Sequence, residues 1–470
     1  MNKMVINHLE KLFVTSDAHT IINESDVHHP AARMIAQAAK MQQNECGDNA
    51  NLILTLCGEL MQQAASLINM GLHPSEIVIG YDKASKRTME LLETLTCHKL
   101  EDPKDKTNLI KCIKSVIASK QFGLEDFLAN LIAEAAIFTM PTNPQKFNVD
   151  NVRIQKILGG GINDSQVIRG VVVTKASETS VKHVKNAKVA VFNTNIEMQQ
   201  GETKGTVLLK NADDLLNYTS GEEDKFEGFI KKLAEAGVSV VVCTGSMSEL
   251  AVHFFEKYHI MAVKIMSKWE LKRIGRAVGA TPIVKLECPT PDEMGYADEV
   301  NFCEISSTWC TVFRRDTEEN KMATIILRGS TMAALDDIER AIDNGVNAVK
   351  SLIRDNRLVA GAGATEMYIA NEIQKLAKTQ PGLDQYAVEK FGVSFEVIPR
   401  ILAENAGYKA EAILADLYAE VNRDSKVHGI DVSDGKVKDA AAAGILDSLE
   451  SKSWAFKLAF DVVLTLLKVD

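Results

Sequence analysis

Apolar residues recur at helical spacing over roughly the first 140 residues of the chain. In residues 51–71 the leucines fall on one stripe, and Gly71 is a C-terminal stop signal. Further runs with the same spacing extend to about Thr139, where a polar segment interrupts them. The pattern is helical again from Gly382 to the end of the chain. We therefore predict that both ends of the chain are mainly helical.

The middle of the chain has a different pattern, with short apolar runs typical of strands. We predict strands over residues 152–160, 167–175, 188–194, 238–243, 260–265, 281–286 and 322–329. Capping boxes at Ser246–Glu249 and Ser267–Glu270 indicate helices between the later strands. This alternation predicts a small α/β domain around a parallel sheet.

The order of these regions favours a nested architecture, in which one outer domain contains both termini. At 470 residues the chain is too long for a single core, so we expect two to four domains. No repeat of 20 to 50 residues points to a solenoid.

Composition excludes several classes of protein. The net charge of −10 and the lack of basic runs argue against binding to nucleic acid. No apolar run reaches the length of a membrane span, so we expect no membrane partner. The eight cysteines are scattered, and even Cys303 and Cys310 lack the spacing of a zinc site. Reduced thiols in a cytoplasmic protein are the simplest interpretation.

The segment CGDNANL, residues 46–52, precedes a long apolar stretch. Asp48 and Asn49 have side chains that cap helices by accepting hydrogen bonds from the first N–H groups. The same N–H groups and the positive end of the helix also attract phosphate. From these residues alone, a plain cap and the floor of a phosphate site both stay open.

Ten short sequence motifs, which occur in a fixed order along the chain, help to choose between the helix cap and the phosphate site. They are VTSDAHTI, ECGDNANL, FNVDNVRIQKILGGGI, ETKGTVLLKNADDLLNY, SKWELKRIGRAVGAT, ILRGST, DDIERAID, LVAGAGATE, IPRILAENAG and GILDS. Together they resemble the group II chaperonins, and in particular the cytosolic CCT (TRiC) family, over essentially the whole chain. The strings MNKMVINHLEKLFVTSDA and ETKGTVLLK indicate one subunit type within that family.

The resemblance implies a multidomain α/β chaperonin fold with three domains. A helical equatorial domain would comprise residues 1–106 and 367–470, and an intermediate domain residues 107–178 and 333–366. Residues 179–332 would form a βαβα apical domain that binds clients. Within it, the polar segment from Asn211 to Glu223 would belong to a helical protrusion that acts as a lid.

The resemblance also implies a site for ATP or ADP with Mg²⁺. Asp48 would bind the metal, and its neighbours would contact the phosphates; the cofactor-binding positions there are Gly47, Asp48, Asn49, Ala50 and Asn51. Asn49 and Ala50 replace the family's Gly and Thr. The side chain at position 49 would crowd the phosphate, and Ala50 removes a hydroxyl donor.

Two positions in the family order the attacking water. Asp17 matches the first. The second, a catalytic carboxylate on the helix ERAIDNGV, is here Asn344, whose amide cannot accept a proton as a general base does. We therefore expect slow hydrolysis or none.

Further matches extend the site toward the base and ribose, and those at Asp447 and Gly429 are the weaker ones. Gly361, Ala362 and Gly363 resemble the family's glycine-rich turn beside the nucleotide, although an ordinary helix-entry turn has the same composition. Asp447 matches an acidic residue near the ribose, and Gly429 lies in a string near the base. Outside this context Asp447 would be a surface helix cap.

The implied function is that of a subunit of the ATP-dependent cytosolic chaperonin, a double ring with seven paralogous partner subunits. The ring would fold clients such as actin and tubulin. The alternatives are a ring subunit that binds nucleotide without hydrolysing it, and an α/β metabolic enzyme with a phosphorylated substrate. The family continues beyond both ends of this sequence. We expect a fragment of a longer subunit; the alternative is a version that dispenses with part of the family's phosphate-binding segment.

Overall fold

The computed structural model describes residues 2–197, 212–306, 308–316 and 322–469. The chain forms two compact units. The terminal unit contains Met1–Ile137, Thr142–Val149 and Ala333–Asp470, and the middle unit contains Phe138–Pro141 and Asp150–Met332. Both ends of the chain thus belong to one unit. The finer division into equatorial, intermediate and apical domains stays a prediction.

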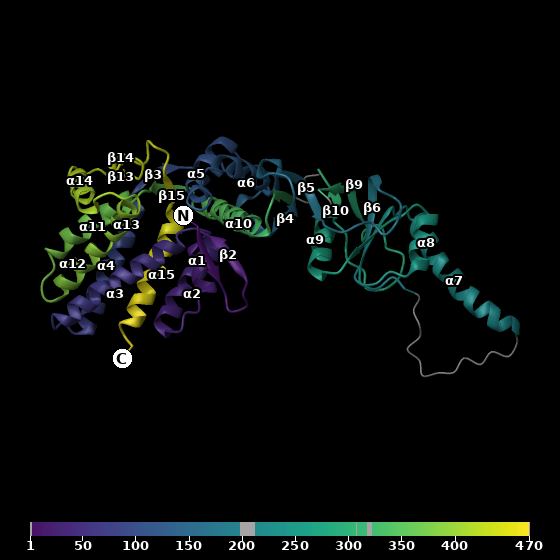
Figure 1. The fold of residues 1–470 in the computed structure, drawn as a ribbon, viewed down its shortest axis with the longest axis horizontal. Coiled ribbons are helices and arrows are strands. Elements are labelled where there is room, and N and C mark those ends of the chain that lie inside the picture. The colour runs from purple at the N-terminus through teal and green to yellow at the C-terminus, as the bar shows by residue number, and fades with distance from the viewer. Residues whose placement is uncertain (1, 198–211, 307, 317–321, 470) are drawn as a thin grey trace. The chain divides into compact units, whose positions relative to one another are not determined.

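The terminal unit is mainly helical (Figure 1). Its helices are α1 (Ala18–Glu24), α2 (Pro30–Cys46), α3 (Ala50–Asn69), α4 (Pro74–Thr94), α5 (Lys106–Ala118), α6 (Glu125–Thr139), α10 (Met332–Arg354), α11 (Ala364–Ala377), α12 (Asp384–Ser394), α13 (Val397–Asn405), α14 (Ala410–Asn422) and α15 (Leu449–Leu466). Its strands are β1 (Lys3–Ile6), β2 (Leu12–Thr15), β3 (Thr96–Lys99), β12 (Arg357–Ala360), β13 (His428–Asp431), β14 (Lys436–Asp439) and β15 (Leu446–Ser448).

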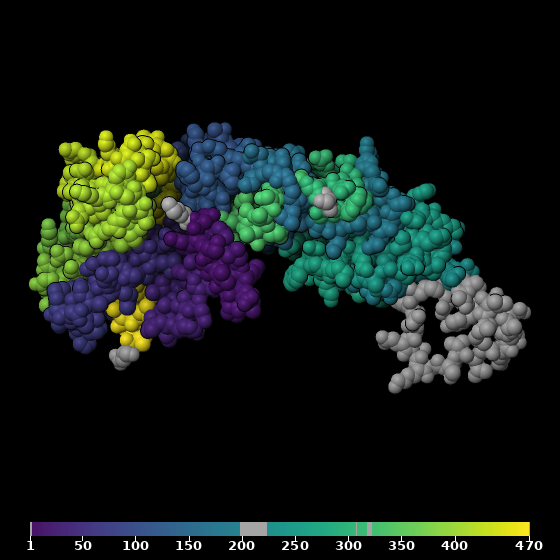
Figure 2. Space-filling view, in the orientation of Figure 1, coloured from purple at the N-terminus to yellow at the C-terminus, as the bar shows by residue number. Residues whose placement is uncertain are grey.

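One hydrophobic core joins the two ends of the chain in this unit. Leu56 and Leu60 of α3 pack in the same cluster as Phe391 of α12 and Phe456 of α15. The yellow α15 lies beside the purple α2 and α3 in Figure 1, and the N-terminal and C-terminal colours adjoin on the surface in Figure 2. The helical periodicity at both ends therefore reflects burial in a shared interior.

The middle unit is built on an eight-stranded sheet with the order β4-β11-β5-β10-β9-β6-β7-β8. The strands are β4 (Val152–Leu158), β5 (Gln166–Val173), β6 (His183–Phe192), β7 (Val240–Thr244), β8 (Met261–Ile265), β9 (Gly295–Ile305), β10 (Thr308–Arg314) and β11 (Ala323–Gly329). The helices are α7 (Ala212–Glu235), α8 (Glu249–Lys257) and α9 (Lys268–Val278).

Strands β7 and β8 and the second half of β6, from Val189 to Phe192, are buried on both faces, which explains their continuous apolar sequences. Val189 and Val191 of β6 pack with α9 on one face, whereas Ala190 and Phe192 pack with α7 and α8 on the other. Adjacent residues of one strand thus belong to different cores.

The structure corrects three predictions for the middle unit. The sheet is mixed, because β5, β10, β9 and β6 pair antiparallel and only the β4–β11 and β6–β7–β8 pairings are parallel. Residues 281–286 form no strand and contribute one bridge, Phe192 to Ile283. Helix α8 is capped by Ser248, since residues around Ser246 pair with Ile196 before the helix begins. The Ser267 cap of α9 is confirmed.

The segment predicted as a lid begins at Asn211, which lies outside the described residues; α7 starts at Ala212. Its role as a lid stays a prediction. Among the described helices, none combines the length and the apolar character needed to cross a membrane.

Candidate functional site

The turn between α2 and α3 is shaped by two residues with left-handed backbone conformation. Gly47 ends α2 with φ of 72°, and a Cβ there would lie 2.5 Å from the carbonyl oxygen of Asn344 on α10. Asn49 precedes α3 with φ of 65° and makes no side-chain capping bond. Its Nδ2 instead donates to Ser451 Oγ at 2.9 Å. The Asn49 side chain therefore does not cap α3.

A cavity of about 180 Å³, here called cavity I, lies at this turn. The first turn of α3 lines it, together with Asp48, Asp17 and Lys120. Asp17 is the N-cap of α1, and its Oδ2 accepts from the N–H and the hydroxyl of Thr20. Of the predicted residues, Asp17, Asp48, Asn49, Ala50 and Asn51 thus all meet at cavity I.

Lys120 brings a positive charge to cavity I. Its ammonium group donates to the Gly47 carbonyl at 2.8 Å and lies 3.9 Å from Asp17 Oδ1. Burial lowers the pKa of Lys120, and the nearby carboxylates Asp48 and Asp17 offset this shift only in part. Burial also raises the pKa of Asp48, while Lys120 lowers it. Cavity I therefore places a desolvated cation beside two acidic side chains.

Asn344 is buried and lies outside the residues that line cavity I. Its Oδ1 accepts a short hydrogen bond from Gln43 Nε2, and Gln43 does line the cavity. Asn344 Nδ2 is buried without a hydrogen-bond partner in the described part of the chain. The position expected to supply a carboxylate therefore presents an amide that is held by Gln43.

A second cavity of about 190 Å³, here called cavity II, shares Asn49, Asn51 and Leu52 with cavity I. Ala362, Gly363 and Asp447 also line it. The two cavities are thus neighbours along the start of α3.

The remaining predicted glycines lie beside cavity II without lining it. A Cβ on Gly429 would lie 2.7 Å from the Ala362 carbonyl oxygen, and one on Gly361 would lie 3.2 Å from Asp447 Oδ2. Both positions bring backbone segments together, which is a reason for glycine at each. Asp447 does not cap α15, because the N-cap is Ser448.

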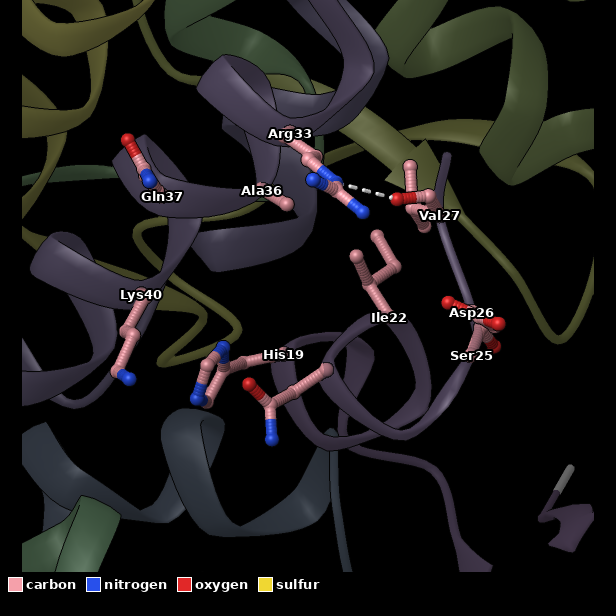
Figure 3. A pocket seen from close by; sticks show the side chains of 10 residues that line it. His19, Ile22, Ser25, Asp26, Val27, Arg33, Ala36, Gln37 and Lys40 are labelled. Atoms are coloured by element: carbon pink, nitrogen blue, oxygen red, sulfur yellow. Dashed lines mark hydrogen bonds between the residues drawn. The ribbon is translucent and has the colours of Figure 1, made fainter. Parts of the chain in front are cut away.

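A larger cavity, of about 350 Å³, lies between α1 and α2 and contains none of the predicted site residues (Figure 3). In the close-up, Arg33 turns toward Val27 and donates to its carbonyl oxygen at 2.7 Å. His19 and Lys40 also line this cavity. The volume of a cavity therefore does not identify the site that the family motifs indicate.

The comparisons with known proteins identify the family. The TCP-1/cpn60 chaperonin family matches residues 1–470. The chain belongs to this chaperonin family. Its fold is thus the multidomain α/β chaperonin fold predicted from the sequence, and its function in protein folding follows from the family.

Relatives of this chaperonin carry the name of the subunit type that the two distinctive strings indicate. The chain is 46% identical to T-complex protein 1 subunit theta of Dictyostelium discoideum, and the match covers 100% of this chain and 88% of the relative. It is also 46% identical to the human theta subunit, with 86% of that protein covered.

A chaperonin needs nucleotide, and the residues at both cavities fit one. Magnesium at nucleotide sites takes one or two carboxylates together with phosphate and water. Asp48 is a carboxylate of this kind at cavity I, although no group of at least three His, Cys, Asp or Glu side chains in the described ranges forms a metal site by itself. The uncapped start of α3 and Lys120 are suitable for phosphate.

Sequence reasoning missed four residues that line the two cavities: Gln43 and Lys120 line cavity I, and Glu366 and Lys452 line cavity II. Lys120 follows the end of α5 and belongs to no recognised motif. Lys452 carried a usable signal, because Leu449, Ala455 and Phe456 place it on the apolar stripe of α15. A lysine on a buried face requires partners.

Proposed function

We propose that this chaperonin is a nucleotide-binding subunit of a hetero-oligomeric double ring in the cytoplasm, assembled with seven paralogous subunits. The observation that carries the nucleotide role is cavity I, where Asp17, Asp48 and Lys120 meet at an uncapped helix start. The relatives' name, T-complex protein 1 subunit theta, supports membership in a complex of several subunits.

The phosphates would lie in cavity I, and the ribose and base in cavity II. Lys120 and the first N–H groups of α3 would bind phosphate oxygens, and Asp48 would hold Mg²⁺, which would neutralise phosphate charge. Asp17 accepts a hydrogen bond from the attacking water. The residues that line the two cavities and the family resemblance support these proposed roles.

Hydrolysis by this subunit would be slow. Asn344 has no carboxylate to accept a proton, and loss of a positioned base costs about a hundredfold to ten-thousandfold in rate. Ala50 is the first residue of α3 and adds no hydroxyl to the phosphate site. A ring subunit that binds nucleotide and rarely hydrolyses it is therefore the favoured form of this function.

Exposed apolar side chains support contacts with other proteins. Met4 and Ile6 of β1 are 69% and 65% exposed, which suits pairing with a neighbouring subunit. In the middle unit, Met266 and Trp269 are both 71% exposed near the start of α9, which suits unfolded clients such as actin and tubulin. Crosslinks from a trapped client that never reach residues 179–332 would exclude this client role.

The nucleotide role is tested by calorimetric titration of the chain with ADP, with and without Mg²⁺. We expect Asp48→Asn to lose most of the Mg²⁺-dependent gain in affinity, since the substitution removes the carboxylate. The matched control is Asp82→Asn on α4, whose exposed carboxylate contacts Lys86. An unchanged Mg²⁺ dependence in Asp48→Asn contradicts the proposed site. Native mass spectrometry of the assembled complex tests the ring.

A further inference from the structure

Lys452 is a fully buried lysine in the first turn of α15. Its side chain is 3% exposed, and its ammonium group lies 2.8 Å from Glu366 Oε1 and 2.9 Å from Asp447 Oδ2. These partners come from α11 and β15, so the three side chains join separate segments of the terminal unit. All three line cavity II.

The electrostatics keep Lys452 charged. Burial lowers the pKa of Lys452, but Glu366 and Asp447 together raise it above its ordinary value. A buried ammonium requires such partners, and its removal would leave two carboxylates facing each other. The three groups therefore act as one unit.

The two carboxylates differ in their access to cavity II. Glu366 is 2% exposed, and its Oε2 has no hydrogen-bond partner among the described residues. The side chain of Asp447 is 22% exposed and contacts Lys452 through Oδ2. Asp447 is therefore the acid that can receive a ligand, and Lys452 determines which way its carboxylate turns.

We propose that Lys452 is a positioning residue that orients Asp447 to accept hydrogen bonds from the ribose hydroxyls of the nucleotide. This inference rests on the proposed nucleotide function. Asp447 would contact the vicinal hydroxyls directly, and Lys452 would act only through Asp447. The pair would thereby select ribonucleotides over nucleotides that lack these hydroxyls.

The test compares the affinities of the full chain for ADP and for 2′,3′-dideoxy-ADP at a fixed Mg²⁺ concentration. Hydrogen bonds to a charged acceptor predict that the unmodified chain prefers ADP by about tenfold or more. We expect Lys452→Met to reduce this preference to about twofold, with little change in affinity for the dideoxy nucleotide. Asp447→Asn should have the same effect, and the control Lys375→Met, which removes an exposed ion pair on α11, should keep the preference.

A purely structural role for Lys452 predicts a different result. Lys452→Met would then weaken the binding of both nucleotides equally, and the ratio of the two affinities would not change. That result would overturn the inference, and so would a lack of preference for ADP over the dideoxy nucleotide in the unmodified chain. In both cases, binding of ADP would still support the proposed function. If ADP does not bind at all, the proposed function fails as well. If Lys452→Met does not fold, the double variant Lys452→Met/Glu366→Met removes both fully buried charges at similar volume. The ratio of its affinities for ADP and the dideoxy nucleotide then tests the inference in the same way.

Discussion

Asn49 shows how a single departure from the family pattern is accommodated. Asparagine tolerates the left-handed conformation better than most residues, so the turn is kept without glycine. The side chain is held by Ser451, the residue just before Lys452 on α15. Asn344 is the other departure, and its neighbours determine what it can do. Gln43 donates to Asn344 Oδ1, a contact that an aspartate would also accept.

We expect Asn344→Asp to increase ATP turnover by this subunit about tenfold or more, because it restores a general base beside cavity I. Gln43 would hold the new carboxylate in the position of the amide. The measurement is steady-state turnover in an otherwise unchanged ring, with hydrolysis by the neighbouring subunits blocked. The matched control is Asn347→Asp, one turn further along α10. Unchanged turnover, already at the level of the neighbouring subunits, would show that the amide is sufficient.

At the scale of elements, the α2–α3 turn depends on the close approach of α10. Gly47 packs against the Asn344 backbone, and Lys120 donates to the Gly47 carbonyl. Three segments far apart in sequence thus fix the turn that carries Asp48. Strain at this turn would therefore affect both the stability of the terminal unit and the proposed phosphate site.

We expect Gly47→Ala to lower the free energy of unfolding of the terminal unit by about 2 kcal/mol or more. The new Cβ would lie 2.5 Å from a backbone oxygen, in a left-handed conformation that alanine disfavours. The control is Gly58→Ala within α3, where nothing lies within 4 Å of the new Cβ. That change should stabilise the helix by about 1 kcal/mol. Denaturant unfolding of both variants measures the difference, and equal stabilities would contradict the close approach.

At the scale of the whole molecule, the chain leaves the terminal unit and returns to it. The middle unit begins and ends with strands that pair in parallel, β4 with β11. Its cores, around β6, β7 and the helices on either face, contain only residues of that unit. The core of the terminal unit, by contrast, draws on both ends of the sequence.

We expect residues 150–332, expressed alone, to fold cooperatively, since this range contains the whole eight-stranded sheet. Residues 1–149 alone should lack a cooperative transition, because their helices pack against residues from 333–470. Thermal unfolding followed by circular dichroism and by amide NMR dispersion distinguishes the two fragments. A cooperatively folded 1–149 fragment would show that the shared core is dispensable.

The sequence by itself determined the local structure and the family. Helical periodicity located α3 and α4, apolar runs located β6 to β8, and Ser267 marked the start of α9, because these signals depend on neighbouring residues. The ordered motifs also indicated Asp17, Asp48 and Asn344 as site positions, which remain proposals. Tertiary structure alone decided which distant segments meet. It brought Lys120 to the Gly47 carbonyl, turned Asn49 toward Ser451 and paired Lys452 with Glu366 and Asp447. It also made the sheet mixed, since a strand's apolar pattern records that its faces are buried but not the direction of the strand beside it.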